Sequence, residues 1–255
     1  MRRDWTDDEM ILALALYFRL PYNRLHKNNP EVIALANLIK RTNNSVAIRL
    51  VNYAACDPAL TSMGKVGMYA GIPKCLPYWN KYINNKEELF WEEANIKAKL
   101  LKENIETSLS IPQQDFTGKE RETVIKQRIN QNAFRAMILA NYNETCAISG
   151  ITVPQLLIAS HIVPWSDNEE NRLNPENGIC LSALYDKAFD SGLIGIRPDD
   201  YTVTISKELK NYRHSDFYNN FFLRIENKAI LMPERHSPNR DFLEYHINNI
   251  FSKYN

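Results

Sequence analysis

The chain has 255 residues, of which 44% are hydrophobic and 24% charged, and its formal net charge is +1. These proportions are typical of a globular protein with one large domain or two small ones. The apolar run at residues 10–18 is shorter than the roughly 18 residues of a membrane helix, and acidic residues precede it, unlike in a secretory signal. We therefore expect a cytoplasmic protein with no membrane partner. Only 8 glycines argue against a glycine-rich phosphate loop.

The cysteines point to a reducing compartment. None of the four, Cys56, Cys75, Cys146 and Cys180, forms a CxxC pair, which argues against a four-cysteine zinc site. We expect free and mostly buried thiols.

Charge is distributed unevenly along the chain. Residues 19–49 hold six basic residues and one acidic residue, whereas 11 basic and 14 acidic residues lie between His161 and the C-terminus. A basic N-terminal patch beside a slightly acidic second half is typical of a nucleic-acid reader joined to another domain. A solvated helix face gives the same pattern, so charge alone leaves both interpretations open.

Helix signals dominate the first 60 residues. Thr6 and Glu9 form a capping-box pattern ahead of an apolar segment that should be central to its domain. Asn29 and Pro30 predict the start of a second helix. Thr42 or Asn43 caps a third, which the Asp57-Pro58 pair ends. The third helix should bury a stripe consisting of Val46, Ile48, Leu50 and Val51, with Arg49 and Asn52 facing away from it.

Three short helices with a tight link between the second and third predict a helix-turn-helix shape. The phrase KRTNNSVAIRL, at residues 40–50, resembles the third-helix entry of Myb-like or homeodomain-like domains, whose polar residues enter the major groove. The resemblance implies a DNA-contacting set made of Arg41, Thr42, Asn43, Asn44, Ser45 and Arg49. A three-helix bundle with a polar corner is the alternative.

The middle of the chain contains one clear break. Residues 61–82 show no regular period and read as loops or a small extension, whereas residues 85–106 are charged and helical. Pro112 and Gly118 then mark a linker. An amphipathic helix is predicted at residues 121–142.

The most informative stretch follows this helix. An apolar, strand-like run carries His161, a polar loop spans residues 166–176, and a second short strand begins at Asn177. A helical segment holding Asp186 and Asp190 comes next and stops at Gly192. Residues 193–196 and 201–205 read as further strands. The order is strand, loop, strand, helix.

This stretch resembles the HNH nuclease family with its ββα-metal core, in the form found in bacterial restriction endonucleases. His161, Asn177 and Asp186 match the three characteristic positions, and the resemblance covers about residues 119–196. It implies an α+β protein in which a helical, helix-turn-helix-like domain at residues 1–95 is joined through a connection at 96–118 to a ββα-metal nuclease domain at 119–255.

The resemblance also implies roles. His161 would be the general base, since its unperturbed pKa is near neutrality. Asp186 would bind Mg²⁺ or Mn²⁺, and Asn177 would fix the loop around the base. Asp190, one helical turn beyond Asp186, is a second ligand or a structural hydrogen-bonding group. Ser160 departs from the family, because many members carry a metal-binding aspartate or histidine there.

We therefore expect a metal-dependent DNA endonuclease of restriction or defence, acting on double-stranded DNA as a homodimer, with Lys187 contacting phosphate. A DNA-binding regulator with a degenerate HNH core is the alternative, and Ser160 keeps it open. The C-terminal helix should turn Phe242, Leu243, Ile247 and Ile250 inward. His246 on that helix is expected to pack on the core rather than join the site.

Overall fold

The computed structural model describes residues 3–65, 67–108 and 119–254. Contacts divide the chain into two units, Met1–Met137 and Ile138–Asn255. The boundary predicted from the sequence lies near residue 119, whereas helix α8 (Lys119–Asn141) contributes residues to both units. The predicted linker residues Pro112 and Gly118 lie outside the described residues. None of the described helices is long and apolar enough to cross a membrane.

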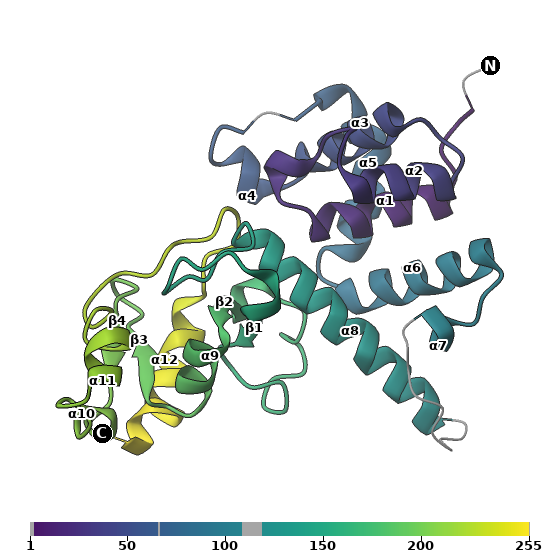
Figure 1. The fold of residues 1–255 in the computed structure, drawn as a ribbon. Coiled ribbons are helices and arrows are strands. Elements are labelled where there is room, and N and C mark those ends of the chain that lie inside the picture. The colour runs from purple at the N-terminus through teal and green to yellow at the C-terminus, as the bar shows by residue number, and fades with distance from the viewer. Residues whose placement is uncertain (1–2, 66, 109–118, 255) are drawn as a thin grey trace. The chain divides into compact units, whose positions relative to one another are not determined.

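The N-terminal unit is helical (Figure 1). Its elements before α8 are α1 (Asp7–Arg19), η1 (Tyr22–Arg24), α2 (Pro30–Leu38), α3 (Asn43–Ala54), α4 (Pro58–Thr61), η2 (Tyr69–Gly71), α5 (Ile72–Tyr82), α6 (Lys86–Leu101) and α7 (Ile105–Ser108). Helix α1 is buried from Glu9 to Phe18, as its apolar sequence predicts, and the Thr6–Glu9 capping box is formed. Helices α2 and α3 begin at the predicted caps Asn29 and Thr42.

Residues 61–82 were expected to form loops or a small extension. The expectation of loops is wrong from residue 69 to residue 82, because η2 and α5 occupy this part. Pro77 inside α5 concealed the helical pattern, since proline is rare in helix interiors. Cys75, Trp79 and Tyr82 recur at helical spacing and are buried. Helix α5 packs on α1 and α3, and the Trp79 ring stacks on Phe18 with centroids 5.5 Å apart.

The outward orientation predicted for Arg49 and Asn52 is also wrong, because both residues are 7% exposed. The Arg49 guanidinium lies over the Trp5 ring, 4.6 Å from its centroid, and Nη1 donates to the Cys75 thiol at 3.4 Å. Asn52 lies so close to Gly71 that a Cβ there would be 2.1 Å from its amide carbon. The unpredicted segment η2–α5 therefore covers the face of α3 that was expected to meet solvent.

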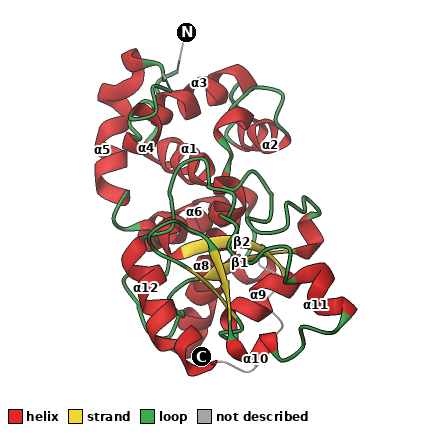
Figure 2. Cartoon of the chain, turned by 90° about the vertical axis from the view of Figure 1, so that its left-hand side faces the viewer, coloured by secondary structure: helices red, strands yellow, loops and turns green. Residues whose placement is uncertain are grey.

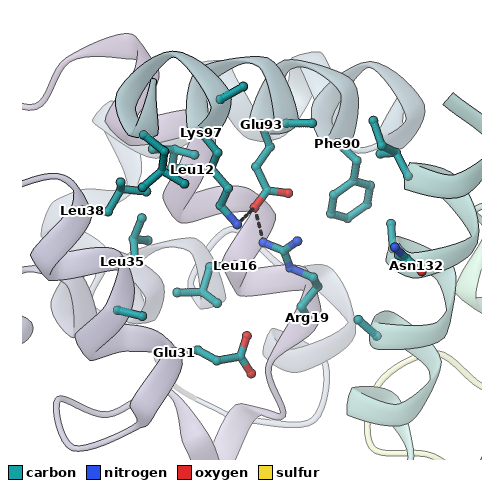
Figure 3. Close-up of a pocket in the computed structure, with 17 residues that line it drawn as sticks. Leu12, Leu16, Arg19, Glu31, Leu35, Leu38, Phe90, Glu93, Lys97 and Asn132 are labelled. Atoms are coloured by element: carbon teal, nitrogen blue, oxygen red, sulfur yellow. Dashed lines mark hydrogen bonds and ion pairs between the residues drawn. The ribbon is translucent and has the colours of Figure 1, made fainter. Parts of the chain in front are cut away.

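A buried ion triad lies in the N-terminal unit. The Glu93 carboxylate on α6 pairs with the Arg19 guanidinium of α1 and, at 2.7 Å, with Lys97 (Figure 3). Burial opposes the ionisation of Glu93, but the two positive charges outweigh it and lower its pKa. The triad lies in the wall of a mostly apolar cavity of about 530 Å³ between α1, α2, α6 and residues 129–136 of α8.

The C-terminal unit is built on two antiparallel strand pairs, drawn in yellow in Figure 2. After α8 its elements are η3 (Pro154–Leu156), β1 (Leu157–His161), η4 (Pro175–Asn177), β2 (Gly178–Ser182), α9 (Ala183–Asp190), β3 (Ile194–Ile196), β4 (Val203–Ile205), α10 (Lys207–Lys210), α11 (Asp216–Phe221), α12 (Arg240–Asn249) and η5 (Phe251–Tyr254). Strand β1 pairs with β2, and β3 pairs with β4. The predicted order of strand, loop, strand and helix is confirmed.

Helix α9 ends as its sequence predicts. Gly192 has φ +68°, and a Cβ there would lie 2.6 Å from the backbone oxygen of Ile250. Only glycine fits this combination of left-handed backbone and close approach. Helix α12 packs beside it through His246, whose ring stacks on Phe189 with centroids 3.6 Å apart. The prediction that His246 packs on the core is confirmed, since the residue is 1% exposed.

All four cysteines are free thiols, as predicted, and three of them are buried. The Cys146 sulfur accepts hydrogen bonds from the backbone N–H groups of Ser149 and Ser182, at 3.3 and 3.1 Å. Ser182 precedes α9, and its own side chain makes no capping hydrogen bond. The thiol therefore joins the turn after Cys146 to the junction of β2 and α9.

Candidate active site

The strand pair β1–β2 fixes the backbone positions of the central residues. Ser160 pairs with Ile179, and His161 pairs with Gly178 at the end of β1. Because successive side chains in a strand point to opposite faces, Ser160 and His161 diverge from one strand end. Ser160 is buried at 3% exposure, whereas His161 is half-buried.

Ser160 faces the two aspartates of α9, which packs against both strands. Asp186 and Asp190 are four residues apart and share a helix face. The Ser160 hydroxyl is buried and makes no well-aligned hydrogen bond within the described part of the chain. It is nonetheless near enough to both carboxylates to oppose the rise that burial causes in the pKa of each. Three oxygen-bearing side chains from β1 and α9 therefore gather at one place.

The electrostatics of this cluster disfavour two negative charges. Burial raises the pKa of Asp186, against the opposing effects of the Ser160 hydroxyl and the Lys187 charge. Partial burial, together with the negative charge of Asp186, raises the pKa of Asp190 to about 6. A positive charge placed between the carboxylates would relieve this repulsion.

The donor set fits a hard divalent cation. Two carboxylates and a hydroxyl are oxygen ligands of the type that Mg²⁺ and Mn²⁺ prefer. Within residues 3–65, 67–108 and 119–254, no three His, Cys, Asp or Glu side chains gather in a way that could hold a metal ion. Waters and substrate oxygens would complete the coordination, as is usual for Mg²⁺.

His161 contacts the loop that joins the two strands. Its Nε2 lies 3.1 Å from the backbone oxygen of Arg172, and its ring meets the Trp165 ring edge-on at 5.4 Å. A carbonyl only accepts, so Nε2 carries the proton, and Nδ1 is the basic nitrogen of the neutral ring. Burial lowers the pKa of His161, with the Arg172 hydrogen bond opposing it. The ring is therefore neutral, and able to accept a proton, at neutral pH.

Asn177 ties the same loop to the start of β2. The residue is 1% exposed, and its Oδ1 accepts from the Val163 N–H at 2.8 Å. Its Nδ2 donates to the backbone oxygens of Val163 and Asn171, at 3.2 and 3.3 Å. These bonds fix the two residues that follow His161, because Ile162 also donates its N–H to the Asn177 carbonyl.

Two residues of the loop make contacts around His161 that the sequence did not predict. The Arg172 side chain donates to the Trp165 carbonyl at 3.0 Å and lies over the Trp165 ring at 5.2 Å. Together they hold the Arg172 carbonyl against the His161 ring. No local sequence motif predicts this arrangement. The sequence signals that could have indicated it are an aromatic residue soon after His161 and a single arginine in an otherwise acidic loop.

The residues predicted to contact DNA divide into two groups. Arg41 is held by the Glu9 carboxylate at 2.8 Å, by the Asp4 backbone oxygen at 2.6 Å and by the Trp5 ring. Its side chain is 9% exposed, and Arg49 is also buried. A base contact by either arginine would therefore require it to leave these partners. The polar residues that begin α3 reach the surface more fully; they are Thr42, Asn43, Asn44 and Ser45. Lys187 on α9 is exposed.

The basic character of residues 19–49 is smaller in the folded unit than in the sequence. Glu9 pairs with Arg41, and Glu93 pairs with Arg19, yet both acids lie outside that window. Lys27 and Lys40 remain exposed. Ion pairs with residues distant in the sequence therefore neutralise part of the positive charge on which the prediction of DNA binding rested.

Comparison with known proteins identifies the segment that holds this site. Residues 146–197 match the family model described as HNH endonuclease. The matched segment begins at Cys146, covers β1, β2 and α9, and ends just after β3. No curated protein matches the chain. The cluster of Ser160, Asp186 and Asp190, and His161 at the end of β1, thus lie within a segment similar to HNH endonucleases.

Proposed function

We propose that this chain is a metal-dependent endonuclease that hydrolyses phosphodiester bonds in DNA. The observation that carries the proposal is the gathering of the buried Ser160 hydroxyl with Asp186 and Asp190 within the HNH-like segment, which also holds His161 at the end of β1. Ser160, Asp186 and Asp190 would hold the cation. A bound Mg²⁺ or Mn²⁺ would stabilise negative charge on the attacked phosphate and on the leaving 3′-oxygen.

His161 supplies the base. The Arg172 carbonyl fixes the Nε2–H tautomer, so Nδ1 accepts a proton from the attacking water. The lowered pKa keeps the ring neutral and ready for this transfer. Asn177 contributes by holding the loop that carries the Arg172 carbonyl rather than by touching the reacting atoms. The family resemblance implies products with a 5′-phosphate and a 3′-hydroxyl.

The finer assignments are part of the same proposal. The substrate is double-stranded DNA, the role is restriction or defence against foreign DNA, and two copies act together so that each cuts one strand. The α2–α3 pair supports a groove-reading role, with Thr42, Asn43, Asn44 and Ser45 as the contacting residues. The competing function is a DNA-binding regulator, favoured by the absence of a metal-binding Asp or His at Ser160.

A plasmid assay separates the two functions. Supercoiled DNA is incubated with Mg²⁺ or Mn²⁺ and the wild type, His161→Ala, or the control His214→Ala, whose histidine is exposed on the same unit. A general base contributes about 10² to 10⁴ in rate, so nicking should fall by that factor in His161→Ala and stay unchanged in the control. Equal inactivity of the wild type and His161→Ala would establish the regulator instead.

A further inference from the structure

A second cavity in the C-terminal unit has the character of an anion site. It measures about 400 Å³ and lies among the turn after Cys146, the segment after α11 and the β4 strand. Among the described residues that line it, two are charged, Arg224 and Lys228. The described lining contains no carboxylate, so neither cation has a carboxylate partner within it. Asn220 and Ser149 add polar side chains.

The N-terminal cavity makes the contrast clear. There Arg19 and Lys97 are both paired with Glu93, so their charges are already compensated (Figure 3). In the C-terminal cavity the nearby Glu226 carboxylate pairs with Lys210 at 2.6 Å instead. Two cations on one concave wall, neither paired with a carboxylate of the residues that the structure describes, attract an anionic group such as phosphate.

The remaining wall suits the sugar and base of a nucleotide. Tyr185, Ile148, Ile225 and Ile230 supply an apolar lining. Helix α11 contributes Asn220 to the lining and also carries Phe217 and Phe221, which are 50% and 43% exposed with ring centroids 5.2 Å apart. Exposed aromatic rings next to cations are the usual combination for stacking bases while holding the backbone.

The cavity is joined to the candidate active site through α9. Tyr185 immediately precedes Asp186, and its hydroxyl donates to the Phe221 carbonyl at 2.7 Å. This bond ties the wall of the cavity to the helix that carries both aspartates. Tyr185 of the cavity wall and the two aspartates that would hold the cation therefore belong to one short helix.

We propose that this cavity binds a nucleotide flanking the cleaved bond, with its phosphate held by Arg224 and Lys228. The inference rests on the proposed nuclease function for the identity of the strand. It assigns a DNA-binding role to a part of the chain whose sequence is slightly acidic.

The test measures DNA affinity without cleavage. Full-length protein is titrated into a labelled DNA duplex in EDTA at several KCl concentrations, and the salt slope of the binding constant is determined. Each phosphate contact contributes about 0.9 to that slope. Arg224→Ala/Lys228→Ala should reduce the slope by about 0.9 to 1.8, and the conservative pair Arg224→Lys/Lys228→Arg should retain it.

The control is Arg213→Ala/Lys253→Ala, which removes the same charge from exposed positions of the same unit outside the cavity. Thermal melting verifies that all variants fold, which their exposed positions favour. Equal slopes for the Arg224→Ala/Lys228→Ala variant and this control would overturn the proposal.

Two further measurements distinguish DNA from other occupants of the cavity. In the first, the wild type binds deoxyadenosine monophosphate saturably and the Arg224→Ala/Lys228→Ala variant does not, while the salt slope of DNA binding is the same for both. This result would assign the cavity to a free nucleotide and overturn the DNA site. In the second, sedimentation shows that the wild type is a dimer and that the variant is not, while DNA binding is unchanged. This result would make the surface a protein interface and would also overturn the DNA site. A wild type that binds DNA with the predicted slope difference but does not nick plasmid would leave this site standing and refute only the nuclease.

Discussion

Replacing Asn177 with alanine tests whether this residue acts through the loop rather than through the chemistry. The substitution leaves the buried Val163 N–H without its 2.8 Å acceptor and takes a donor from the Val163 and Asn171 carbonyls. An unsatisfied buried donor costs about 1–3 kcal/mol, and each lost neutral hydrogen bond about 0.5 kcal/mol or more. We expect a loss of about 3 kcal/mol in the free energy of unfolding.

Urea denaturation followed by tryptophan fluorescence measures this loss, and plasmid nicking is assayed at a temperature where the variant is fully folded. The matched control is Asn174→Ala in the same loop. Asn174 is half-buried, accepts from the Glu176 N–H at 3.0 Å as the cap of η4 and donates to Asn171 at 2.9 Å, so its replacement should cost about 1 kcal/mol. If Asn177→Ala were as stable as the Asn174→Ala control, the buried hydrogen bonds would not hold the loop, and the reasoning would be refuted.

Three further changes test the fold. Glu93→Gln leaves Arg19 and Lys97 near an uncharged partner and should lower the free energy of unfolding by about 3 kcal/mol. This is the lower end for a broken buried pair, because Lys97 reaches solvent. A loss below about 1 kcal/mol in urea denaturation would contradict a buried triad. Gly192→Ala should lower stability by about 2 kcal/mol or more, from its φ of +68° and the Ile250 oxygen, whereas Gly150→Ala, with a similar φ but open space, should cost less. Burial lowers the pKa of His246 to about 4 from 6.5, so the unfolded chain binds this proton first as the pH falls. Between pH 7 and pH 5 the wild type should therefore lose about 2 kcal/mol more stability than His246→Phe, in which the groups that titrate elsewhere are unchanged.

Local signals predicted the helix starts and the order of elements around the site. The Thr6–Glu9 box, the Asn29–Pro30 pair and the Thr42 cap satisfy backbone N–H groups within three residues, so they do not depend on the rest of the fold. The strand, loop, strand and helix between Leu157 and Asp190 were likewise readable from apolar runs and turn residues.

Helix α5 and the burial of Arg49 were not predictable in the same way. Pro77 disguises α5 as a loop, and the helix is stabilised by packing of Trp79 and Tyr82 on α1 and α3 rather than by its local propensity. Once α5 was missed, the face of α3 that it covers was assigned to solvent. The two errors therefore have one cause.

By itself, the sequence determined where α1, α2 and α3 begin, and that His161, Asn177 and Asp186 occur in the HNH order. Tertiary structure decided which charges remain available, since Glu9 and Glu93 neutralise Arg41 and Arg19 from distant positions. It also decided that the Ser160 hydroxyl meets both aspartates. The physical reason is the distance along the chain over which each effect acts. Helix caps and the alternation of side chains along a strand depend on near neighbours in the chain. Ion pairs, desolvation and shared cation sites depend on which distant side chains the fold brings into contact.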